Sequence, residues 1–184
     1  AVKAGITEVP ALIVSLDRDA AAIVLVDSNL HREHILPSEK AFAYKMKAEA
    51  LAHKGYRTDL TSVQVAPKLA TEQIAEDAGT SKDTIKRYIR LTNLIPEILQ
   101  YVDDGRIAFT PAVELSYLLP EEQTMLLSEM EYNDCTPNLS QAQRIKELSM
   151  QGLFTQDRLS AIMGEEKANQ KERVKIPAER IRKY

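Results

Sequence analysis

Apolar residues after residue 17 recur every three or four positions, and this spacing predicts a mainly α-helical chain. Proline and glycine mark many of the expected boundaries, because proline fits the first turn and glycine favours the left-handed conformation that ends a helix. The longest predicted helix therefore begins at Pro37 and stops at Gly55. The other predicted helices begin near Asp17, Thr71, Thr80, Pro96, Thr110, Pro120, Ser140 and Thr155.

The N-terminal region has a different pattern. Residues 9–16 form a β-branched and apolar run, which predicts the chain's one strand. The helix that follows Asp17 is apolar throughout its middle, and we expect it to be buried. Residues 56–68 show no sustained period and predict a loop. The predicted fold class is mainly α, a multi-helical domain with a small α/β remnant of one strand at the N-terminus.

Residues 71–91 predict two short helices joined at Gly79. Thr80 and Asp83 have the T-x-x-D spacing of a capping box, which opens the second helix. The small side chain of Ala75 allows the two helices to approach closely where they cross. A helix, a glycine turn and a second helix at this spacing are typical of the helix-turn-helix unit, whose second helix enters the DNA major groove.

The second helix of this pair carries a basic face. Between residues 81 and 91 there are four cations and one Asp, although the whole chain has a net charge of −3. A local positive charge on an acidic protein favours an oriented, site-specific DNA contact over nonspecific packaging. The alternative is an ordinary helical hairpin with a solvated basic face. The expected DNA-binding residues are Thr80, Ser81, Lys82, Thr84, Lys86, Arg87 and Arg90, with Thr71 and Gln73 holding a phosphate at the start of the first helix.

Composition excludes several other classes of protein. The single cysteine, Cys135, rules out an internal disulfide, and the three histidines have no metal-ligand spacing, so we expect no metal site. No apolar run is long enough for a membrane span, and the default expectation is a cytoplasmic protein. The chain also lacks a Gly-rich phosphate loop and a paired His and carboxylate set, so we expect no enzymatic activity.

The order of these elements resembles one family. An AxxAG turn leads into VPALIV, a helix ends in DSNLHRE, and a proline-led long helix precedes the helix-turn-helix. This order is similar to the central portion of the ParB partition proteins, over residues 1 to about 160. Both ends look cut, which predicts an excised middle piece.

The resemblance implies a homodimer that binds a palindromic centromere-like (parS-type) site in double-stranded DNA and works with a ParA-type ATPase. It also implies a switch driven by CTP and Mg²⁺, in which Asn29 and Arg32 match a nucleotide-binding E-N-x-x-R segment. Ser28 stands where that segment has its Glu, and the phosphate-binding segment would precede Ala1. We therefore expect no cofactor in this chain itself. Asn29 and Arg32 are equally explained by a helix C-terminal turn and a surface ion pair.

The resemblance also predicts a domain plan. Residues 1–35 are assigned to the end of a nucleotide-binding domain, residues 36–164 to the DNA-binding domain, and residues 165–184 to a basic linker that leads to a dimerisation segment. Two other functions fit the same architecture: a transcriptional repressor or nucleoid-occlusion factor, and a CTP-binding or hydrolysing switch.

Overall fold

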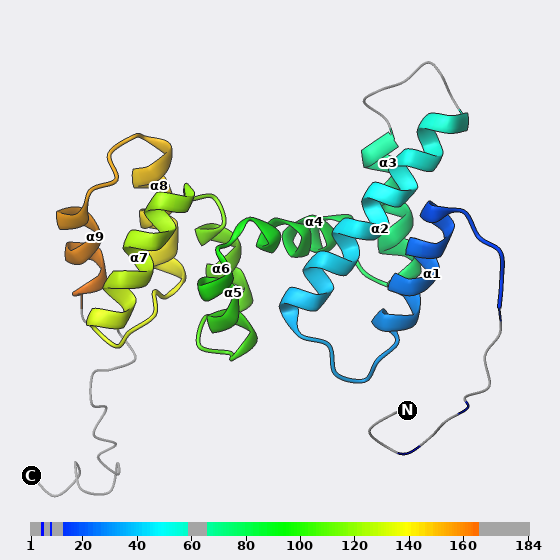
Figure 1. Ribbon diagram of the computed structural model, residues 1–184. Coiled ribbons are helices and arrows are strands. Elements are labelled where there is room, and N and C mark those ends of the chain that lie inside the picture. The colour runs from blue at the N-terminus through cyan, green and yellow to red at the C-terminus, as the bar shows by residue number, and fades with distance from the viewer. Residues whose placement is uncertain (1–4, 6–7, 9–12, 59–65, 166–184) are drawn as a thin grey trace, which may run out of the picture. The chain divides into compact units, whose positions relative to one another are not determined.

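The computed structural model describes Gly5, Glu8 and residues 13–58 and 66–165, with only the backbone described for residues 54–58 and 66–69 (Figure 1). The described residues are mainly α-helical, which confirms the predicted fold class. They contain no strand. None of the described helices combines the length and the hydrophobicity that a bilayer span requires.

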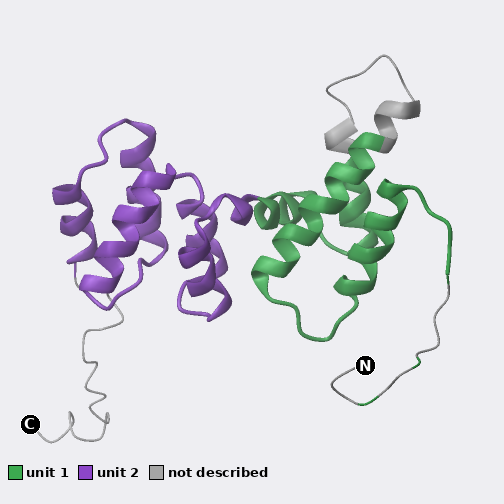
Figure 2. Ribbon diagram, in the orientation of Figure 1, with its two compact units in different colours: residues 1–89 green, residues 90–184 purple. Residues whose placement is uncertain are grey.

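The chain folds as two compact units, Ala1–Ile89 and Arg90–Tyr184 (Figure 2). This division falls inside the region that the sequence assigns to one DNA-binding domain. The assignment of residues 1–35 to a separate nucleotide-binding domain stays a prediction, but the helix that these residues contribute packs within unit 1. Unit 1 contains α1 (Arg18–Leu30), α2 (Pro37–Thr58), α3 (Ala66–Asp77) and all but the last residue of α4 (Lys82–Arg90).

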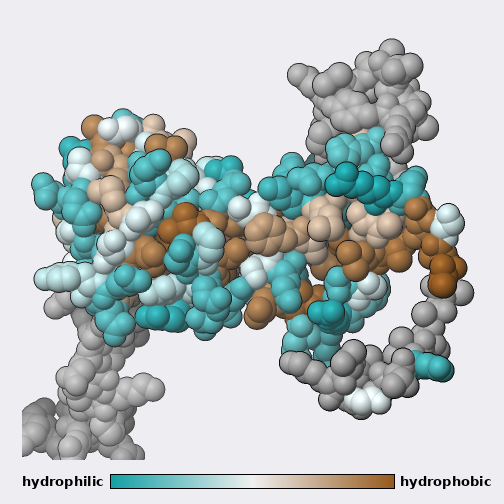
Figure 3. Space-filling view, in the orientation of Figure 1, coloured by the Kyte–Doolittle hydropathy of each residue, from teal (hydrophilic) through white to brown (hydrophobic). Residues whose placement is uncertain are grey.

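The N-terminal region of unit 1 differs from the prediction in two ways. Residues 13–16 are not a strand, because no described strand lies beside them to complete a ladder, and residues 9–12 fall outside the description. The α1 helix begins after the predicted cap Asp17, whose carboxylate accepts the Ala20 N–H at 2.7 Å, but it is not buried. Only Val26 is buried on α1, while Val24 and Leu25 are more than half exposed. Figure 3 shows hydrophobic residues at the surface over α1 and the segment before it.

Helix α2 does not stop at Gly55 but continues to Thr58. A glycine inside a helix costs only about 0.5–1 kcal/mol relative to alanine, so it does not end a helix unless the chain turns there. Residues 56–58 and 66–68 are likewise helical where a loop is predicted, and residues 59–65 lie outside the described part.

Unit 2 follows the predicted boundaries more closely. Pro96 and Pro120 each open a helix, and Gly105 and Gly152 follow helices with φ of +71° and +66°. One cap is displaced: the box that opens α8 pairs Asn138 with Gln141 rather than Ser140 with Gln143. The elements of this unit are the 3-10 helix η2 (Leu91–Asn93), α5 (Pro96–Asp103), α6 (Phe109–Leu115), α7 (Pro120–Tyr132), α8 (Leu139–Met150) and α9 (Gln156–Met163).

Candidate DNA-binding surface

The turn between α3 and α4 has the geometry that the glycine predicts. Gly79 has φ of +60°, a conformation that strains any residue with a Cβ. The Thr80 N–H donates to the Ala75 carbonyl at 2.9 Å, and the Gly79 N–H donates to the Glu76 carbonyl at 3.2 Å. These bonds close the last turn of α3 and reverse the chain into α4.

A small apolar core fixes the angle between the two helices. Ile85 of α4 is fully buried against Ile74 and Ala75 of α3, and Tyr44 of α2 completes the cluster. The Tyr44 and Tyr88 rings meet edge to face, with centroids 5.7 Å apart. Burying a side chain such as Ile85 contributes about 1.5–3 kcal/mol, so the apolar side of α4 is held inward.

The polar side of α4 faces outward, as predicted. Ser81, Lys82, Asp83 and Lys86 are exposed, and Thr84 and Arg87 are half-buried. Thr80 in the turn and Gln73 on α3 are exposed as well. The structure therefore gathers most of the predicted DNA-binding residues on α4 and the turn before it, and their contacts with DNA stay a prediction.

The cap of α4 lies one residue later than the sequence indicates. The Thr84 N–H donates to the Ser81 hydroxyl at 3.1 Å, and the two hydroxyl oxygens are 2.9 Å apart. Ser81 rather than Thr80 is thus the capping residue, because α4 begins at Lys82 and Thr84 occupies the third helical position. The carboxylate of Asp83, predicted to close the box, is exposed on α4 instead.

Lys82 has a partner that the sequence analysis did not identify. Its Nζ lies 3.3 Å from the Glu72 carboxylate of α3, and both side chains are exposed. An ion pair of this kind contributes about 0–1 kcal/mol, so a DNA phosphate can replace Glu72 at little cost.

The prediction for Thr71 is wrong in its mechanism. Helix α3 begins at Ala66, so Thr71 lies inside the helix and does not cap it. Its side chain is buried. The N-terminal N–H groups that were expected to hold a phosphate there belong instead to residues near Ala66.

Arg90 has internal partners in unit 2. Its guanidinium donates to the Ser116 carbonyl at 3.1 Å and lies 3.8 Å from the centroid of the Tyr117 ring. Lys146 Nζ lies 3.9 Å from the same centroid and 2.8 Å from the Glu114 carboxylate. The Arg90 guanidinium is therefore held against the Tyr117 ring and the Ser116 carbonyl. The sequence instead predicts an exposed Arg90 side chain that contacts a DNA phosphate.

A cavity of about 560 Å³ lies among α1, α2 and the end of α3. Arg32 lines this cavity, but Asn29 does not, so the two predicted nucleotide-binding residues do not share its wall. The Arg32 N–H donates to the Asn29 carbonyl at 3.2 Å, which is a helix C-terminal turn. Among the described residues, no group of three or more His, Cys, Asp or Glu side chains is arranged to hold a metal ion.

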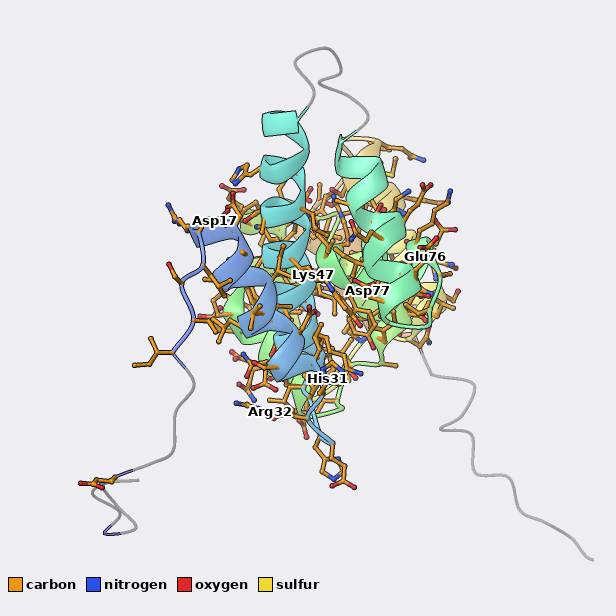
Figure 4. The ribbon with its side chains drawn as sticks, turned by 90° about the vertical axis from the view of Figure 1, so that its right-hand side faces the viewer. Asp17, His31, Arg32, Lys47, Glu76 and Asp77 are labelled. Carbon is orange, nitrogen blue, oxygen red and sulfur yellow. The ribbon has the colours of Figure 1, made fainter. Side chains whose placement is uncertain are left out.

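Lys47 is buried on the wall of this cavity. Its Nζ lies 2.7 Å from Asp27 Oδ1 on α1 and 2.8 Å from Asp77 Oδ2 on α3, and Figure 4 shows it between these two helices. Burial alone lowers the pKa of Lys47, but the hydrogen bonds and charges of the two carboxylates outweigh it and raise the pKa above its ordinary value. The burial of Lys47 could have been predicted from the sequence, because Lys47 follows Tyr44 by three positions and therefore lies on the apolar face of α2.

Comparison with known proteins agrees with this geometry. Residues 37–136, more than half of the chain, match the ParB HTH domain family. The chain belongs to the ParB family. The ParB HTH match covers α2 to α7 and includes the whole helix-turn-helix.

Curated relatives of this ParB-family chain include proteins with two kinds of name. It is 34% identical over 131 residues to the chromosome-partitioning protein Spo0J of Thermus thermophilus, covering 71% of this chain and 42% of the relative. It is 34% identical over 110 residues to the probable chromosome 1-partitioning protein ParB of Deinococcus radiodurans, covering 59% and 32%. A nucleoid occlusion protein of Listeria innocua is 30% identical over 142 residues, covering 77% and 44%. The chain thus spans less than half the length of these relatives.

Proposed function

We propose that this chain recognises a specific double-stranded DNA site through α4, as part of a ParB-type partition protein of a chromosome or plasmid. The observation that carries the proposal is the exposed polar face of α4, held outward by the buried Ile85 and presented by a helix-turn-helix core. Lys82 and Lys86 are both exposed on this face. Lysine side chains on a helix in the major groove bind guanine edges or phosphates.

The proposed contacts differ in what they contribute. Residues of the N-terminal half of a recognition helix reach base edges, and we assign Lys82 and Lys86 this role, with Ser81 and Thr84 supporting them through the cap. Gln73, Thr80 and Arg87 are assigned to the backbone phosphates, which position the protein without reading sequence. Arg90 and Thr71 are left out, because the first has partners in unit 2 and the second is buried.

Fluorescence anisotropy tests this assignment. Duplexes selected from a random pool and scrambled duplexes of the same composition would be compared at several salt concentrations. We expect Lys86→Ala to lower the preference for the selected duplex by about fivefold or more, the discrimination of one base contact. Lys45→Ala, which removes an exposed lysine of α2, is the matched control and should leave the preference unchanged. A preference that is the same in both variants would remove α4 from the proposed interface.

The proposed site is palindromic (parS-type) and is bound by two copies of the chain. One helix-turn-helix makes few contacts, so two half-sites about 34 Å or a multiple apart are needed for useful affinity. Sedimentation of the free chain and of the chain with a duplex of two half-sites tests this idea. We expect a monomer in the absence of DNA and two chains per duplex, whereas a tight dimer without DNA would contradict it.

A second candidate is a nucleoid-occlusion factor or repressor with the same DNA-binding surface. It is favoured by the relatives named nucleoid occlusion protein, such as that of Listeria innocua. Genome-wide mapping of bound sites separates the two functions. Sites clustered near a replication origin or on a plasmid support partition, and sites spread over promoters or along the chromosome support the alternatives.

The ParA-type ATPase partner and the CTP switch are proposed for a ParB-type protein as a whole and not for the residues of this chain alone, together with a cytoplasmic location on the nucleoid or a plasmid. Arg32 on the cavity wall supports a nucleotide-binding contribution from α1, and Asn29, outside the cavity, does not. We propose that this chain is not itself an enzyme. Calorimetry with CTP and Mg²⁺ tests the assignment, and saturable binding or hydrolysis by this chain would overturn it.

A further inference from the structure

Lys47 holds together three helices of unit 1. Its side chain, which is only 5% exposed, reaches from α2 to Asp27 near the end of α1 and to Asp77, the last residue of α3. Both carboxylates remain partly open to solvent, at 40% and 49% exposed. The ammonium is therefore the buried member of the group, and the carboxylates are its links to the neighbouring helices.

The last residues of α3 are exposed beyond the core contacts of Ile74 and Ala75. Ile74 and Ala75 are buried in the core, but Glu76, Asp77 and Ala78 are all exposed. Asp77 and Ala78 also line the cavity, so the exposed side of the last turn of α3 borders a hollow, while Ile74 and Ala75 pack on its other side. The hydrogen bond from Lys47 to Asp77 links this turn to α2 through a side chain.

This turn leads directly into the recognition helix. Only residues 78–81 separate Asp77 from Lys82, and Ser81 in this segment caps α4. A displacement of Asp77 therefore reaches the first residues of α4 with little chain to absorb it. Hydrogen bonds to base edges weaken steeply with small changes of distance and angle, so the placement of this end of α4 decides how well bases are read.

We propose that Lys47 is a positioning residue for DNA recognition, which holds Asp77 over the cavity and so fixes the last turn of α3 and the start of α4. Asp27 has a different role, which is to orient the ammonium from the side of α1. The inference rests on the proposed DNA-reading function of α4. At neutral pH the raised pKa keeps Lys47 protonated, as this role requires.

Asp77→Asn and Asp27→Asn form a matched pair of variants. Each keeps the size of the side chain and removes one of the two charges bound to the same ammonium, at distances of 2.8 and 2.7 Å. A purely structural role predicts similar losses of thermal stability and of DNA binding in both. A positioning role predicts that only Asp77→Asn changes how DNA sequences are discriminated.

The experiment measures anisotropy with the selected and scrambled duplexes, at a temperature where circular dichroism shows both variants folded. We expect Asp77→Asn to lower the ratio of the two affinities by about tenfold, which is the discrimination of one base contact, and Asp27→Asn to lower it by less than about twofold. Lys47→Arg should retain most of the ratio, and Lys47→Met should behave like Asp77→Asn. Equal ratios in Asp77→Asn and Asp27→Asn, or an unchanged ratio in Asp77→Asn, would overturn the proposal.

Hydrogen exchange without DNA separates this inference from the proposed function. Asp77→Asn should speed the exchange of the Ala78, Gly79 and Thr80 amides by about tenfold relative to Asp27→Asn. If exchange changes in this way but the unmodified chain prefers no duplex, the DNA-reading function fails and the positioning of the turn stands. If exchange at the turn is the same in both variants, the positioning role itself is wrong.

Discussion

Gln123 in unit 2 and Lys47 in unit 1 are both buried polar side chains that join three segments of chain, but their partners differ. Gln123 Oε1 accepts the Ile95 N–H at 2.8 Å, and its Nε2 donates to the Asn93 and Leu118 carbonyls at 3.0 Å each. A neutral amide thus binds main-chain groups, whereas Lys47 is a charge that binds two half-exposed carboxylates beside a cavity. Charges near solvent respond to salt and pH, and neutral main-chain bonds respond little.

This difference suggests different tasks for the two units. Each of the five described α-helices of unit 2 carries a fully buried residue, which is typical of a rigid support: Ile98, Leu115, Leu126, Ile145 and Leu159. The core cluster of the helix-turn-helix in unit 1 is smaller and leaves α3 to end over a hollow. Regions with few buried contacts open at lower free energy, so we expect unit 1 to be the more easily shifted of the two.

The largest expected effect comes from the two cores. Leu126→Ala in unit 2 and Ile85→Ala in unit 1 each remove a fully buried side chain, at a cost of about 2–5 kcal/mol. We expect hydrogen exchange to show lost protection mainly in the unit that carries the substitution. If either variant lost protection equally throughout the chain, the two units would unfold as one and the comparison would not hold.

Gln123→Leu should have the next largest effect. It leaves the Ile95 N–H and two carbonyls without their side-chain partner inside unit 2, and an unsatisfied buried polar group costs about 1–3 kcal/mol. We expect a loss of about 2–4 kcal/mol in the free energy of unfolding, measured with urea. The loss should be the same in low and high salt, and a strong salt dependence would contradict the contrast with Lys47.

Lys47→Met should cost less than Gln123→Leu. Removing one member of a fully buried ion pair is severe because the remaining charge stays unsolvated, but Asp27 and Asp77 are half-exposed and can take up water. The expected loss is about 1–2 kcal/mol, with Lys45→Met on the exposed side of α2 as the control. A loss larger than that of Gln123→Leu would show that the carboxylates are effectively buried.

Alkaline pH should affect unit 1 through the same lysine. The folded state raises the pKa of Lys47 above 10.5, so its contribution to stability is complete below that pH and is lost as pH rises through the folded pKa. Burial, with the nearby Tyr88, also raises the pKa of Tyr44 above 10.0, against the opposing effect of Lys47, and this adds a loss in the same direction. Thermal midpoints should therefore fall above about pH 10, and less steeply in Lys47→Met. A parallel fall in both proteins would exclude the lysine as a cause.

The units also differ in how well the sequence predicted them. Pro96, Pro120 and Thr155 mark helix starts in unit 2 correctly, because these signals act locally through fixed φ and free N–H groups. In unit 1, Gly79 and the inward face of α4 follow equally local rules and are confirmed. The wrong predictions concern residues whose conformation depends on the neighbouring chain. Gly55, for example, is compatible with a turn but lies inside α2, which continues to Thr58.

The sequence predicted the exposure of site residues where it depends on their position around their own helix, but not their contacts with other helices. Lys82, Lys86 and Ser81 are exposed because of their angular position on α4, which periodicity gives directly. Glu72 against Lys82, Asp77 against Lys47 and Arg90 on Tyr117 join residues that are far apart in sequence. No spacing rule specifies such pairs, and they determine which cations are available to DNA.

The smallest expected effect on stability belongs to Glu72. Glu72→Gln removes the exposed partner of Lys82 and should change the free energy of unfolding by about 0–1 kcal/mol. Its effect on DNA should be larger, because the substitution removes a negative charge beside the proposed interface and frees the ammonium for a phosphate. We expect duplex affinity to rise about two- to fivefold at low salt, with the gain shrinking as salt increases. Glu165→Gln, which breaks the similarly exposed Arg144 pair in unit 2, is the control. If both variants gained the same duplex affinity, the gain would come from the change in net charge alone. The contrast between unit 1, which is proposed to read DNA, and unit 2, which is proposed to support it, would then fail.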